Sequence, residues 1–455
     1  MKLSVIGGGG VRSMFLARSL TQRARELGID TIVFMDNNPD KLRVFGGMAR
    51  QVARRIDPGV RFVLTGSPVE AVTDADYAIT TMRVGGDSKR VDDETAALEL
   101  GLLGQETTGA AGFSFAMRSV PALAEYCELV RRYAKPGAKV FNFTNPAGLV
   151  SQALRDMGYD FTFGICDAPS GMLHAFAKAL GERPDALTGE CYGLNHLSFF
   201  ERVMLNGRDI MPELMADPRA YRDTDLRFFE PELVKRLGQI PNEYLYYFFY
   251  PERAVSNIRA SGTTRGTVIR DVNLKMLEEL SRMDVERDFD ACLAVFEKWH
   301  GIRENSYMQN ETQTDAHKPP FRFDVYSQDA GGYAGVALKY IEAERTGKAT
   351  QMILCVPNRG AIAGLEDDDV VEVSCDITKD GCAPHRFPHP ARIPMEYIRR
   401  VKLYERLGSE AIRERDAQKA VDCLMVHPLV GSYSLAKRLV ARYIELGGDY
   451  IGGWK

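Results

Sequence analysis

The sequence has no long hydrophobic run, no block of like charges and no closely spaced cysteine pair. Its 455 residues carry 58 basic and 62 acidic side chains, so the formal charge is only −4 at pH 7. No apolar stretch approaches the roughly 20 residues that span a bilayer, which argues against a membrane protein. The absence of a basic patch argues against nucleic acid as a partner. The eight scattered cysteines, and an N-terminus without the apolar core of a signal peptide, are typical of a cytoplasmic protein with reduced thiols.

Short apolar runs alternate with helical patterns over roughly the first 165 residues. These runs predict strands at Lys2–Ile6, Thr31–Met35, Phe62–Leu64, Tyr77–Thr81, Lys139–Phe143 and Phe161–Ile165, with a long helix over Ser119–Tyr133. Such alternation indicates a parallel sheet with helical crossovers. We therefore expect a doubly wound, Rossmann-type α/β domain at the N-terminus.

The pattern changes after this region. Leu187–Cys191 and Phe199–Leu205, followed by the turn Asn206-Gly207, predict antiparallel strands. Further expectations are a helix over Ala334–Glu344, strands at Met352–Val356 and Val370–Val373, and three helices between residues 394 and 447. We therefore expect an N-terminal domain over residues 1–190 and a C-terminal α+β domain over residues 191–455. Because no Pro/Gly/Ser-rich linker separates them, the two should share a large interface.

Four glycines, Gly7–Gly10, lie between the first predicted strand and a helix. Glycine lets the backbone approach a pyrophosphate, and the helix N-terminus offers it unpaired N–H groups. Arg12 takes the place of the third glycine of G-x-G-x-x-G, so this fingerprint is incomplete. Asp36 ends the second strand, where a carboxylate would bind both ribose hydroxyls and repel a 2′-phosphate. This order of features favours NAD over NADP; the structural alternative is a tight turn with a helix-capping aspartate.

Several further segments are too specific for a generic dinucleotide-binding domain. They are RVGGDSKR at 83–90, GQETTG at 104–109, NFTNPA at 142–147, GICDAP at 164–169, YGLNHL at 192–197, PNEYLYY at 241–247 and VPNRGA at 356–361. Together they resemble glycoside hydrolase family 4, whose members include NAD- and Mn-dependent 6-phospho-glucosidases related in fold to lactate and malate dehydrogenases. The resemblance covers nearly the whole chain, from Lys2 to the segment His427–Val430.

This resemblance implies elimination and addition rather than hydrolysis by two carboxylates. NAD⁺ would take hydride from C3 of the sugar, and the resulting ketone would acidify the proton at C2. A base would remove that proton, the enediolate would expel the C1 substituent, water would add to the enone, and NADH would return the hydride to C3. Because no net redox change occurs, the nicotinamide would remain a resident cofactor.

The resemblance also assigns the metal ligands and the catalytic groups. Cys166 and His196 match the two metal ligands, and a thiolate with an imidazole suits Mn²⁺ or another divalent metal; spacing alone would leave them as structural residues. Tyr244 matches the base for C2, and a phenol that titrates at about 10 needs a nearby cation for this role. Asp167 matches the acid of α-directed members, with helix capping as its structural alternative. The loop at residues 10–13 instead resembles β-directed members, so the anomer preference stays open.

The glycine loop and the resemblance together give the remaining site residues. The expected NAD contacts are Gly7, Gly9, Gly10, Val11, Arg12, Asp36, Arg83 and Asn145, and the expected substrate contacts are Arg90, Glu106, Asn145, Asn195 and Arg265. The guanidinium groups of Arg83, Arg90 and Arg265 suit an anionic substrate group, and Glu106 is expected to orient an arginine or a hydroxyl. We interpret Tyr246 and Tyr247 as packing residues and the other histidines, including His317, as structural.

Three alternatives to a 6-phospho-glycoside hydrolase follow from the same residues. The mechanism could act on a glycoside with another C6 anion, such as a sulfonate, or on an unphosphorylated one. A sugar dehydrogenase that releases NADH is the second alternative, but it needs no metal–tyrosine pair. A non-catalytic NAD-binding module is the third, disfavoured by the retention of the cysteine, histidine and tyrosine. Related enzymes are dimers or tetramers, so we expect a homodimer or homotetramer.

Overall fold

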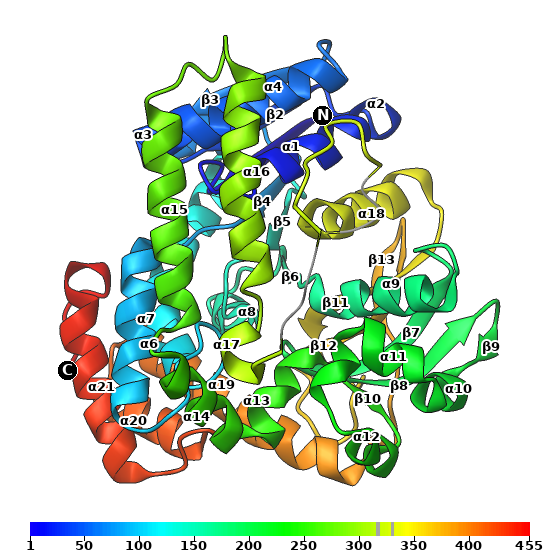
Figure 1. The fold of residues 1–455 in the computed structure, drawn as a ribbon, viewed down its shortest axis with the longest axis vertical. Coiled ribbons are helices and arrows are strands. Elements are labelled where there is room, and N and C mark those ends of the chain that lie inside the picture. The colour runs from blue at the N-terminus through cyan, green and yellow to red at the C-terminus, as the bar shows by residue number, and fades with distance from the viewer. Residues whose placement is uncertain (315–318, 329–331) are drawn as a thin grey trace.

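One sheet of nine strands runs through the molecule (Figure 1). The computed structural model describes residues 1–314, 319–328 and 332–455, so His317 lies outside the described residues. The strand order is β13-β12-β11-β6-β5-β4-β1-β2-β3. The strands are β1 Lys2–Ile6, β2 Thr31–Met35, β3 Arg61–Thr65, β4 Tyr77–Thr80, β5 Lys139–Asn142, β6 Thr162–Gly164, β11 Thr350–Pro357, β12 Val370–Thr378 and β13 Gly381–Pro384.

The half of this sheet from β6 to β3 is parallel throughout. β1 lies at its centre, with β2 hydrogen-bonded on one side and β4 on the other. This is the Rossmann order, and its topological switch point between β1 and β4 is where such folds bind dinucleotides. The predicted parallel sheet is confirmed, and the observed strand ends lie within one residue of the predicted ones.

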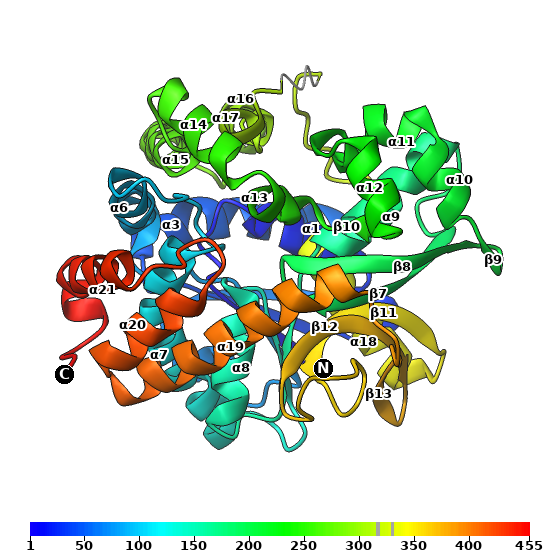
Figure 2. The same cartoon turned by 90° about the horizontal axis from the view of Figure 1, so that it is seen from below.

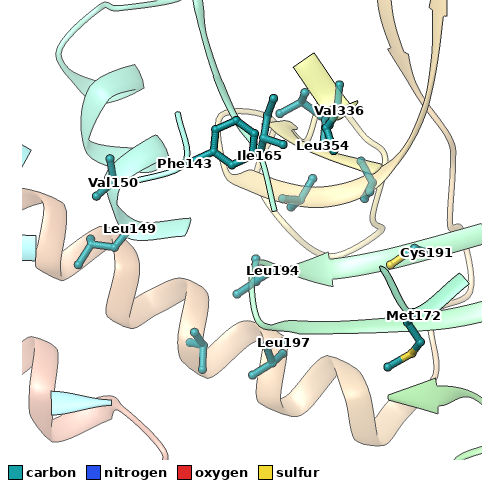
Figure 3. Packing of buried hydrophobic residues seen from close by; sticks show 14 of the residues in the cluster. Phe143, Leu149, Val150, Ile165, Met172, Cys191, Leu194, Leu197, Val336 and Leu354 are labelled. Carbon is teal, nitrogen blue, oxygen red and sulfur yellow. The ribbon is translucent and has the colours of Figure 1, made fainter. Parts of the chain in front are cut away.

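The remaining three strands come from the second half of the chain and continue the same sheet. β11 runs antiparallel to β6, with Cys355 opposite Gly164, and β12 and β13 follow in antiparallel order. Figure 3 shows the consequence for packing, because Ile165, Cys191 and Leu354 belong to one hydrophobic cluster. The two halves of the chain therefore share a core, which explains why no linker separates them.

A second, smaller sheet is antiparallel and carries a short turn that matters for the site. It consists of β7 Leu187–Leu194, β8 Leu197–Leu205, β9 Arg208–Asp209 and β10 Ile240–Pro241. The predicted antiparallel pair is confirmed, and Asn206-Gly207 forms the turn between β8 and β9 as expected. The turn between β7 and β8 contains only Asn195 and His196, so the histidine lies at the tip of a buried hairpin.

Helices pack around both sheets (Figures 1 and 2). They are α1 Ser13–Gln22, α2 Ala24–Leu27, α3 Pro39–Lys41, α4 Gly47–Ile56, α5 Pro68–Val72, α6 Gly86–Glu99, α7 Ala110–Tyr133, α8 Ala147–Asp156, α9 Ala168–Leu180, α10 Met211–Ala216, α11 Pro218–Asp223, α12 Pro231–Leu237, α13 Tyr246–Phe249, α14 Pro251–Ser261, α15 Arg265–Ser281, α16 Phe289–Asn305, α17 Gln309–Thr312, α18 Gly332–Thr346, α19 Arg392–Glu414, α20 Ala417–Val426 and α21 Tyr433–Gly447. The single-turn segments are η1 Leu42–Gly46, η2 Asp225–Phe228, η3 Glu243–Leu245 and η4 Gly448–Tyr450. The three predicted C-terminal helices and α18 are confirmed.

The long helix α7 departs from its predicted start. It begins at Ala110 rather than Ser119, so Pro121 lies inside the helix and not near its start. A proline inside a helix removes one backbone hydrogen bond and clashes with the preceding turn. The turns before Pro121 are buried, with Phe113 and Met117 at most 1% exposed, and this packing offsets the cost.

Helices α15 and α16 form a pair that packs against α6, η1 and α4 of the N-terminal half (Figure 1). Met276 and Phe296 from this pair pack with Phe45 and Val52 of the N-terminal half in a separate hydrophobic cluster. This cluster fixes the pair beside the switch point. No helix among the described residues is both long and apolar enough to cross a membrane, and all eight cysteines are free thiols.

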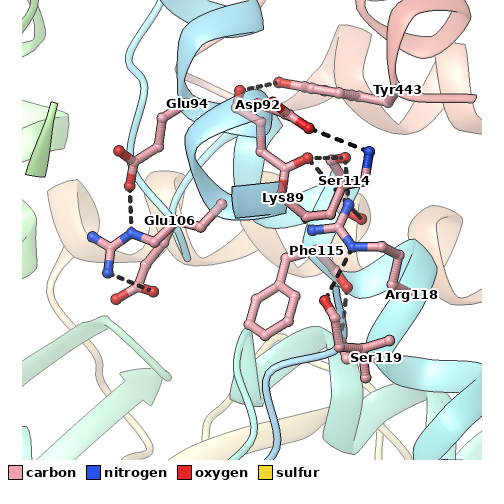
Figure 4. A network of polar contacts seen from close by, with 12 residues as sticks. Lys89, Asp92, Glu94, Glu106, Ser114, Phe115, Arg118, Ser119 and Tyr443 are labelled. Carbon is pink, nitrogen blue, oxygen red and sulfur yellow. Dashed lines mark hydrogen bonds and ion pairs between the residues drawn. The ribbon is translucent and has the colours of Figure 1, made fainter. Parts of the chain in front are cut away.

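A buried ion pair ties α6 to α7 and yields a stability prediction. Arg118 Nη2 lies 2.5 Å from Asp93 Oδ2, and the two side chains are only 1% and 2% exposed; Figure 4 shows the contacts of Arg118. Arg118→Met would leave the Asp93 carboxylate buried without its cation, so we expect the free energy of unfolding to fall by about 3–5 kcal/mol in urea titration.

The control is Arg132→Met near the end of the same helix, where an exposed arginine contacts Glu128. Exposed pairs contribute less than about 1 kcal/mol. Equal losses in the two variants would contradict a structural role for the buried pair.

Candidate functional site

A cavity of about 400 Å³ lies beside the ends of β1, β4 and β5, against the α15–α16 pair. We refer to it as the main cavity. Its walls bring together many residues predicted from the sequence: Gly9, Gly10, Val11, Arg12, Arg83, Arg90, Glu106, Asn145, Tyr244 and Arg265. The other predicted residues are not among its lining residues: Gly7, Asp36, Cys166, Asp167, Asn195 and His196.

The glycine loop is held by Asp36 at the end of β2. The backbone N–H groups of Gly9 and Asn38 donate to the two oxygens of this carboxylate, each at 2.9 Å. A Cβ atom on Gly9 would lie only 2.8 Å from Asp36 Oδ2, so this approach requires glycine. Gly7 lies behind the loop and donates its N–H to the Met35 carbonyl. The loop can thus present its backbone to a pyrophosphate, whereas a ribose contact by Asp36 stays a prediction.

Cys166 and His196 meet although thirty residues separate them. Cys166 follows β6 and His196 lies in the β7–β8 turn, and their Sγ and Nε2 atoms are 3.6 Å apart. His196 has φ of +62°, a left-handed conformation that is uncommon for residues other than glycine. Such an outlier is often found at functional sites. Burial lowers the pKa of His196 to about 4, so its imidazole is neutral at pH 7 and able to ligate a metal.

Hydrogen bonds fix which nitrogen of His196 carries the proton. Gln105 Oε1 accepts from the backbone N–H groups of Thr107 and Thr108, which identifies that atom as the amide oxygen. The Thr107 hydroxyl also donates to Gln105 Oε1, so its proton is already used when it meets His196 Nδ1 at 3.2 Å. Nδ1–H must therefore donate to Thr107. The bare Nε2 faces Cys166, which is the arrangement of a metal-binding histidine.

The thiol and the imidazole provide only two protein ligands for a metal ion. Among the described residues, no group of three or more His, Cys, Asp or Glu side chains could hold a metal ion. Burial raises the pKa of the Cys166 thiol, and the neighbouring Glu372 and Asp167 add to the effect. A divalent cation here would have to take most of its ligands from substrate or water, which leaves the open coordination face that a catalytic site needs.

Tyr244 lies directly against the imidazole. Its ring stacks on that of His196 with centroids 3.7 Å apart and an interplanar angle of 9°. It belongs to η3, where Asn242 caps the turn by accepting from the Tyr244 N–H. Burial raises the pKa of Tyr244, and the acidic neighbours Glu243 and Cys166 raise it further. The phenol is therefore protonated unless positive charge is brought close to it.

Asp167 occupies the position before α9, but its side chain makes no capping hydrogen bond. The capping alternative is therefore wrong. Asp167 Oδ2 instead lies 3.9 Å from Arg12 Nη1, and this pair joins the end of β6 to the glycine loop. Burial raises the pKa of Asp167, while Arg12 acts in the opposite direction.

Glu106 ties two of the predicted arginines together. Its Oε2 lies 2.6 Å from Arg83 Nη2 and 3.1 Å from Arg90 Nη1. Burial alone would raise the pKa of Glu106, but Arg83, Arg90 and Arg265 outweigh it and hold that pKa well below its ordinary value. Figure 4 shows Glu106 beside Glu94, and Glu94 accepts from Arg90 Nε at 2.7 Å.

Glu94 also fixes the start of α15. Its Oε2 accepts from the Gly266 N–H at 2.8 Å, and a Cβ atom on Gly266 would collide with this carboxylate. This contact holds the neighbouring Arg265 at the N-terminus of α15, where it lines the main cavity.

The two predicted asparagines have different surroundings. Asn145 follows β5 and lines the main cavity. The Asn195 amide instead donates to Glu372 Oε1 at 3.1 Å and lines a small cavity behind His196. Glu372 is buried and forms no ion pair with any of the described residues, and burial raises its pKa to about 7.

The structure adds residues that sequence reasoning missed. Arg303, Glu304 and Tyr307 line the main cavity from α16 and its end, and Tyr247 lines it although we had interpreted it as a packing residue. Tyr246 is buried, as expected for packing. The segment that contains residues 303–307 has no recognisable motif, so nothing in the sequence singled it out. Tyr247 follows Tyr244 by about one helical turn, and this spacing could have predicted that both side chains line the same cavity.

The fold and this site define a dinucleotide-binding α/β protein with a thiol–imidazole pair beside its cavity. Comparison with protein families is specific: residues 2–182 match the family 4 glycosyl hydrolases, and residues 191–430 match the family 4 glycosyl hydrolase C-terminal domain. The chain therefore belongs to the family 4 glycosyl hydrolases, as the resemblance predicted.

Individual relatives span the whole chain. The 6-phospho-beta-glucosidase BglT of Thermotoga maritima is 27% identical, with 99% of each chain covered, and its structure with manganese, NAD⁺ and glucose-6-phosphate matches this fold with a TM-score of 0.81. The maltose-6′-phosphate glucosidase MalH of Clostridium acetobutylicum is 27% identical over 99% of this chain and 98% of its own. Malate dehydrogenase of Plasmodium falciparum, 12% identical, covers 91% of this chain and 98% of its own with a TM-score of 0.51, which supports the predicted fold class alone.

The buried Glu243 gives the site a pH-dependent stability. Burial raises its pKa to about 8, with a further contribution from Asp225. Between its ordinary value of 4.5 and about 8, the folded state holds a proton that the unfolded state lacks, so stability falls as pH rises through this range. Glu243→Gln removes this titration. We expect its melting temperature, relative to the wild type, to increase steadily from pH 5 to pH 8.

Glu232→Gln on α12 is the matched control, since Glu232 is 79% exposed. The difference between this variant and the wild type should stay constant across the same pH range. A constant difference for Glu243→Gln as well would show that its carboxyl is ionised in the folded protein at neutral pH.

Proposed function

We propose that this protein hydrolyses a 6-phospho-glycoside with NAD and a divalent cation, preferably Mn²⁺. The observation that carries the proposal is the contact between Cys166, His196 and Tyr244 beside the glycine-loop cavity. When bound, NAD would supply a hydride acceptor and donor for C3 of the sugar, and the cation would supply a Lewis acid for the adjacent oxygens. The relatives named above are phospho-glucosidases, and one was solved with NAD⁺, manganese and a sugar phosphate.

The residues of this chain would have separate roles in binding and catalysis. Cys166 and His196 would hold the cation, and Gly9, Gly10 and Val11 would bind the dinucleotide. Tyr244 would take the C2 proton, which requires the positive charge that those ligands bring next to its ring. The proposed sequence is oxidation at C3, deprotonation at C2, loss of the C1 substituent, addition of water and re-reduction at C3.

Asp167 would give its proton to the departing oxygen. Burial raises its pKa, which favours the protonated acid required before bond cleavage. The relatives include enzymes named for both β- and α-linked substrates, so the proposal covers either anomer. We further propose a cytoplasmic homodimer or homotetramer built from an N-terminal NAD domain (residues 1–190) and a C-terminal domain (residues 191–455).

The test uses 4-nitrophenyl 6-phospho-glucosides of both anomers, with and without deuterium at C2. We expect nitrophenol release that needs NAD and Mn²⁺, a primary isotope effect or solvent exchange at C2, and no net NADH. Cys166→Ser should lose at least about a hundredfold in rate, whereas Cys382→Ser, another half-buried thiol, should not.

Two outcomes would overturn this assignment. NADH accumulating in step with product would identify a dehydrogenase. Full retention of the C2 label in the product would exclude the deprotonation step.

The Thr107 hydroxyl offers a test of the metal site that needs no turnover. Thr107→Val keeps the shape of the side chain but removes the acceptor for His196 Nδ1–H. We expect the dissociation constant for Mn²⁺, measured by titration calorimetry on the NAD-loaded protein, to rise about 10–100-fold.

The neighbouring Thr108→Val is a close control, because the Thr108 hydroxyl is buried and has no hydrogen-bond partner in the described part of the chain. Equal Mn²⁺ affinity in the Thr107 and Thr108 variants would count against His196 as a ligand.

A further inference from the structure

Glu372 is a buried carboxylate that the proposed mechanism does not use. It lies in β12, is only 2% exposed and forms no ion pair with the described residues. A buried carboxylate without a counter-charge lowers stability unless hydrogen bonds offset the cost. The donors of these hydrogen bonds therefore indicate the role of Glu372.

The carboxylate holds the β7–β8 turn on both sides of His196. Its Oε1 accepts from the Asn195 amide at 3.1 Å, and its Oε2 accepts from the Ser198 hydroxyl at 2.7 Å. Asn195 is the first residue of the turn and Ser198 is the second residue of β8. His196 therefore lies in the short segment between the two hydrogen bonds.

These two bonds act on a backbone that is unusual. His196 has the left-handed conformation that glycine adopts most readily. Such a conformation persists only where the surrounding structure imposes it. The bonds from Glu372 restrain Asn195 and Ser198, on either side of this position. A change in the turn would rotate the imidazole away from Cys166.

The same carboxylate also borders the strand that leads to Cys166. The Cys355 thiol lies 3.9 Å from Glu372 Oε1, and Cys355 is paired with Gly164 of β6. A Cβ atom on Gly164 would lie only 2.8 Å from the Cys355 Cβ, so β6 and β11 are closely packed there. Because Gly164 precedes Cys166 by two residues, Glu372 is linked to both elements that carry the proposed metal ligands.

We propose that Glu372 is a positioning residue of the metal site, and that its hydrogen bonds to the β7–β8 turn hold His196 with Nε2 facing Cys166. This inference rests on the proposed function and deepens it. Glu372 acts through hydrogen-bond geometry and not through its charge, so glutamine can replace it. The glutamine oxygen can accept from Asn195, and its amide can donate to the Ser198 oxygen, because a hydroxyl also accepts.

The test compares variants that remove or keep these hydrogen bonds. Glu372→Met has a similar size but no acceptor, and Glu372→Gln keeps both contacts. Ser374→Ala is the matched control, because Ser374 is also buried and lies on the same face of β12. Its hydroxyl bonds to the β7 backbone at Gly189 and Cys191 and not to the turn. Ser198→Ala removes one of the two bonds and is the milder variant if Glu372→Met does not fold.

Two properties are measured for each variant. The dissociation constant for Mn²⁺ is obtained by titration calorimetry on the NAD-loaded protein. The proton on His196 Nδ1 is observed by NMR of the metal-free protein, whose histidines are labelled with nitrogen-15, and its signal is assigned with His196→Gln.

In Glu372→Met we expect the dissociation constant for Mn²⁺ to rise about 10–100-fold. The Nδ1–H signal should shift or disappear, because the hydrogen bond from His196 to Thr107 depends on the same orientation. Ser198→Ala should show a smaller rise. Glu372→Gln and Ser374→Ala should stay within about threefold of the wild type and keep the signal.

Wild-type Mn²⁺ affinity in a folded Glu372→Met variant, or in Ser198→Ala if that variant does not fold, would overturn the inference. So would equal losses of affinity in Glu372→Met and Glu372→Gln, which would assign the effect to the charge. An equal loss in Ser374→Ala would also overturn it, because general loosening of the contact between β7 and β12 would then explain the result.

This inference and the proposed function can fail separately. A wild-type protein that binds no Mn²⁺ would refute the proposed function, and the His196 signal of the metal-free variants would still decide whether Glu372 positions the imidazole. Mn²⁺-dependent hydrolysis with unchanged Mn²⁺ affinity in Glu372→Met would refute the positioning role alone.

Discussion

The orientation of one imidazole governs the site. His196 is held on three sides: Thr107 accepts from Nδ1, Cys166 faces Nε2, and the ring of Tyr244 covers one face. These three groups come from distant parts of the chain, and they meet the imidazole because the large sheet and the β7–β8 hairpin share one core. The left-handed backbone at His196 is the local strain that this arrangement maintains.

Charge in the main cavity is organised into two unlike groups. Around Glu106, arginines and carboxylates neutralise each other, and Glu94 links α6 to the start of α15. Arg265 and Arg303 form no ion pair within 4 Å in the described part of the chain, and their Nε atoms have no hydrogen-bond partner there. Arg265 nevertheless lies over the ring of Tyr307 and helps to lower the pKa of Glu106. The first group positions Arg265 through Glu94 and Gly266. The two groups differ in whether their arginines form ion pairs with carboxylates, and not in residue type.

The sequence was informative where chemistry is local. Strand positions and the glycine loop were predictable because burial and backbone geometry leave a short-range pattern, and Lys2–Ile6 and Thr31–Met35 were located to the residue. Cys166, His196 and Tyr244 could be selected only through resemblance to a family, since no spacing rule links residues that meet by tertiary folding. Neither a local pattern nor a family motif pointed to Arg303. The start of α7 was misplaced because burial of its first turns overrode the usual preference of proline.

The thiol, imidazole and phenol share one electrostatic consequence of their burial. Burial raises the pKa of Cys166 and of Tyr244 and lowers that of His196, so in the free protein all three groups are uncharged at neutral pH. An uncharged set avoids the cost of burying ions without partners. A divalent cation held by Cys166 and His196, as proposed, would reverse this balance, because it would favour the thiolate and the phenolate over their protonated forms. Cation binding would then generate the base, and the same low dielectric that keeps the free site neutral would strengthen the effect of the cation.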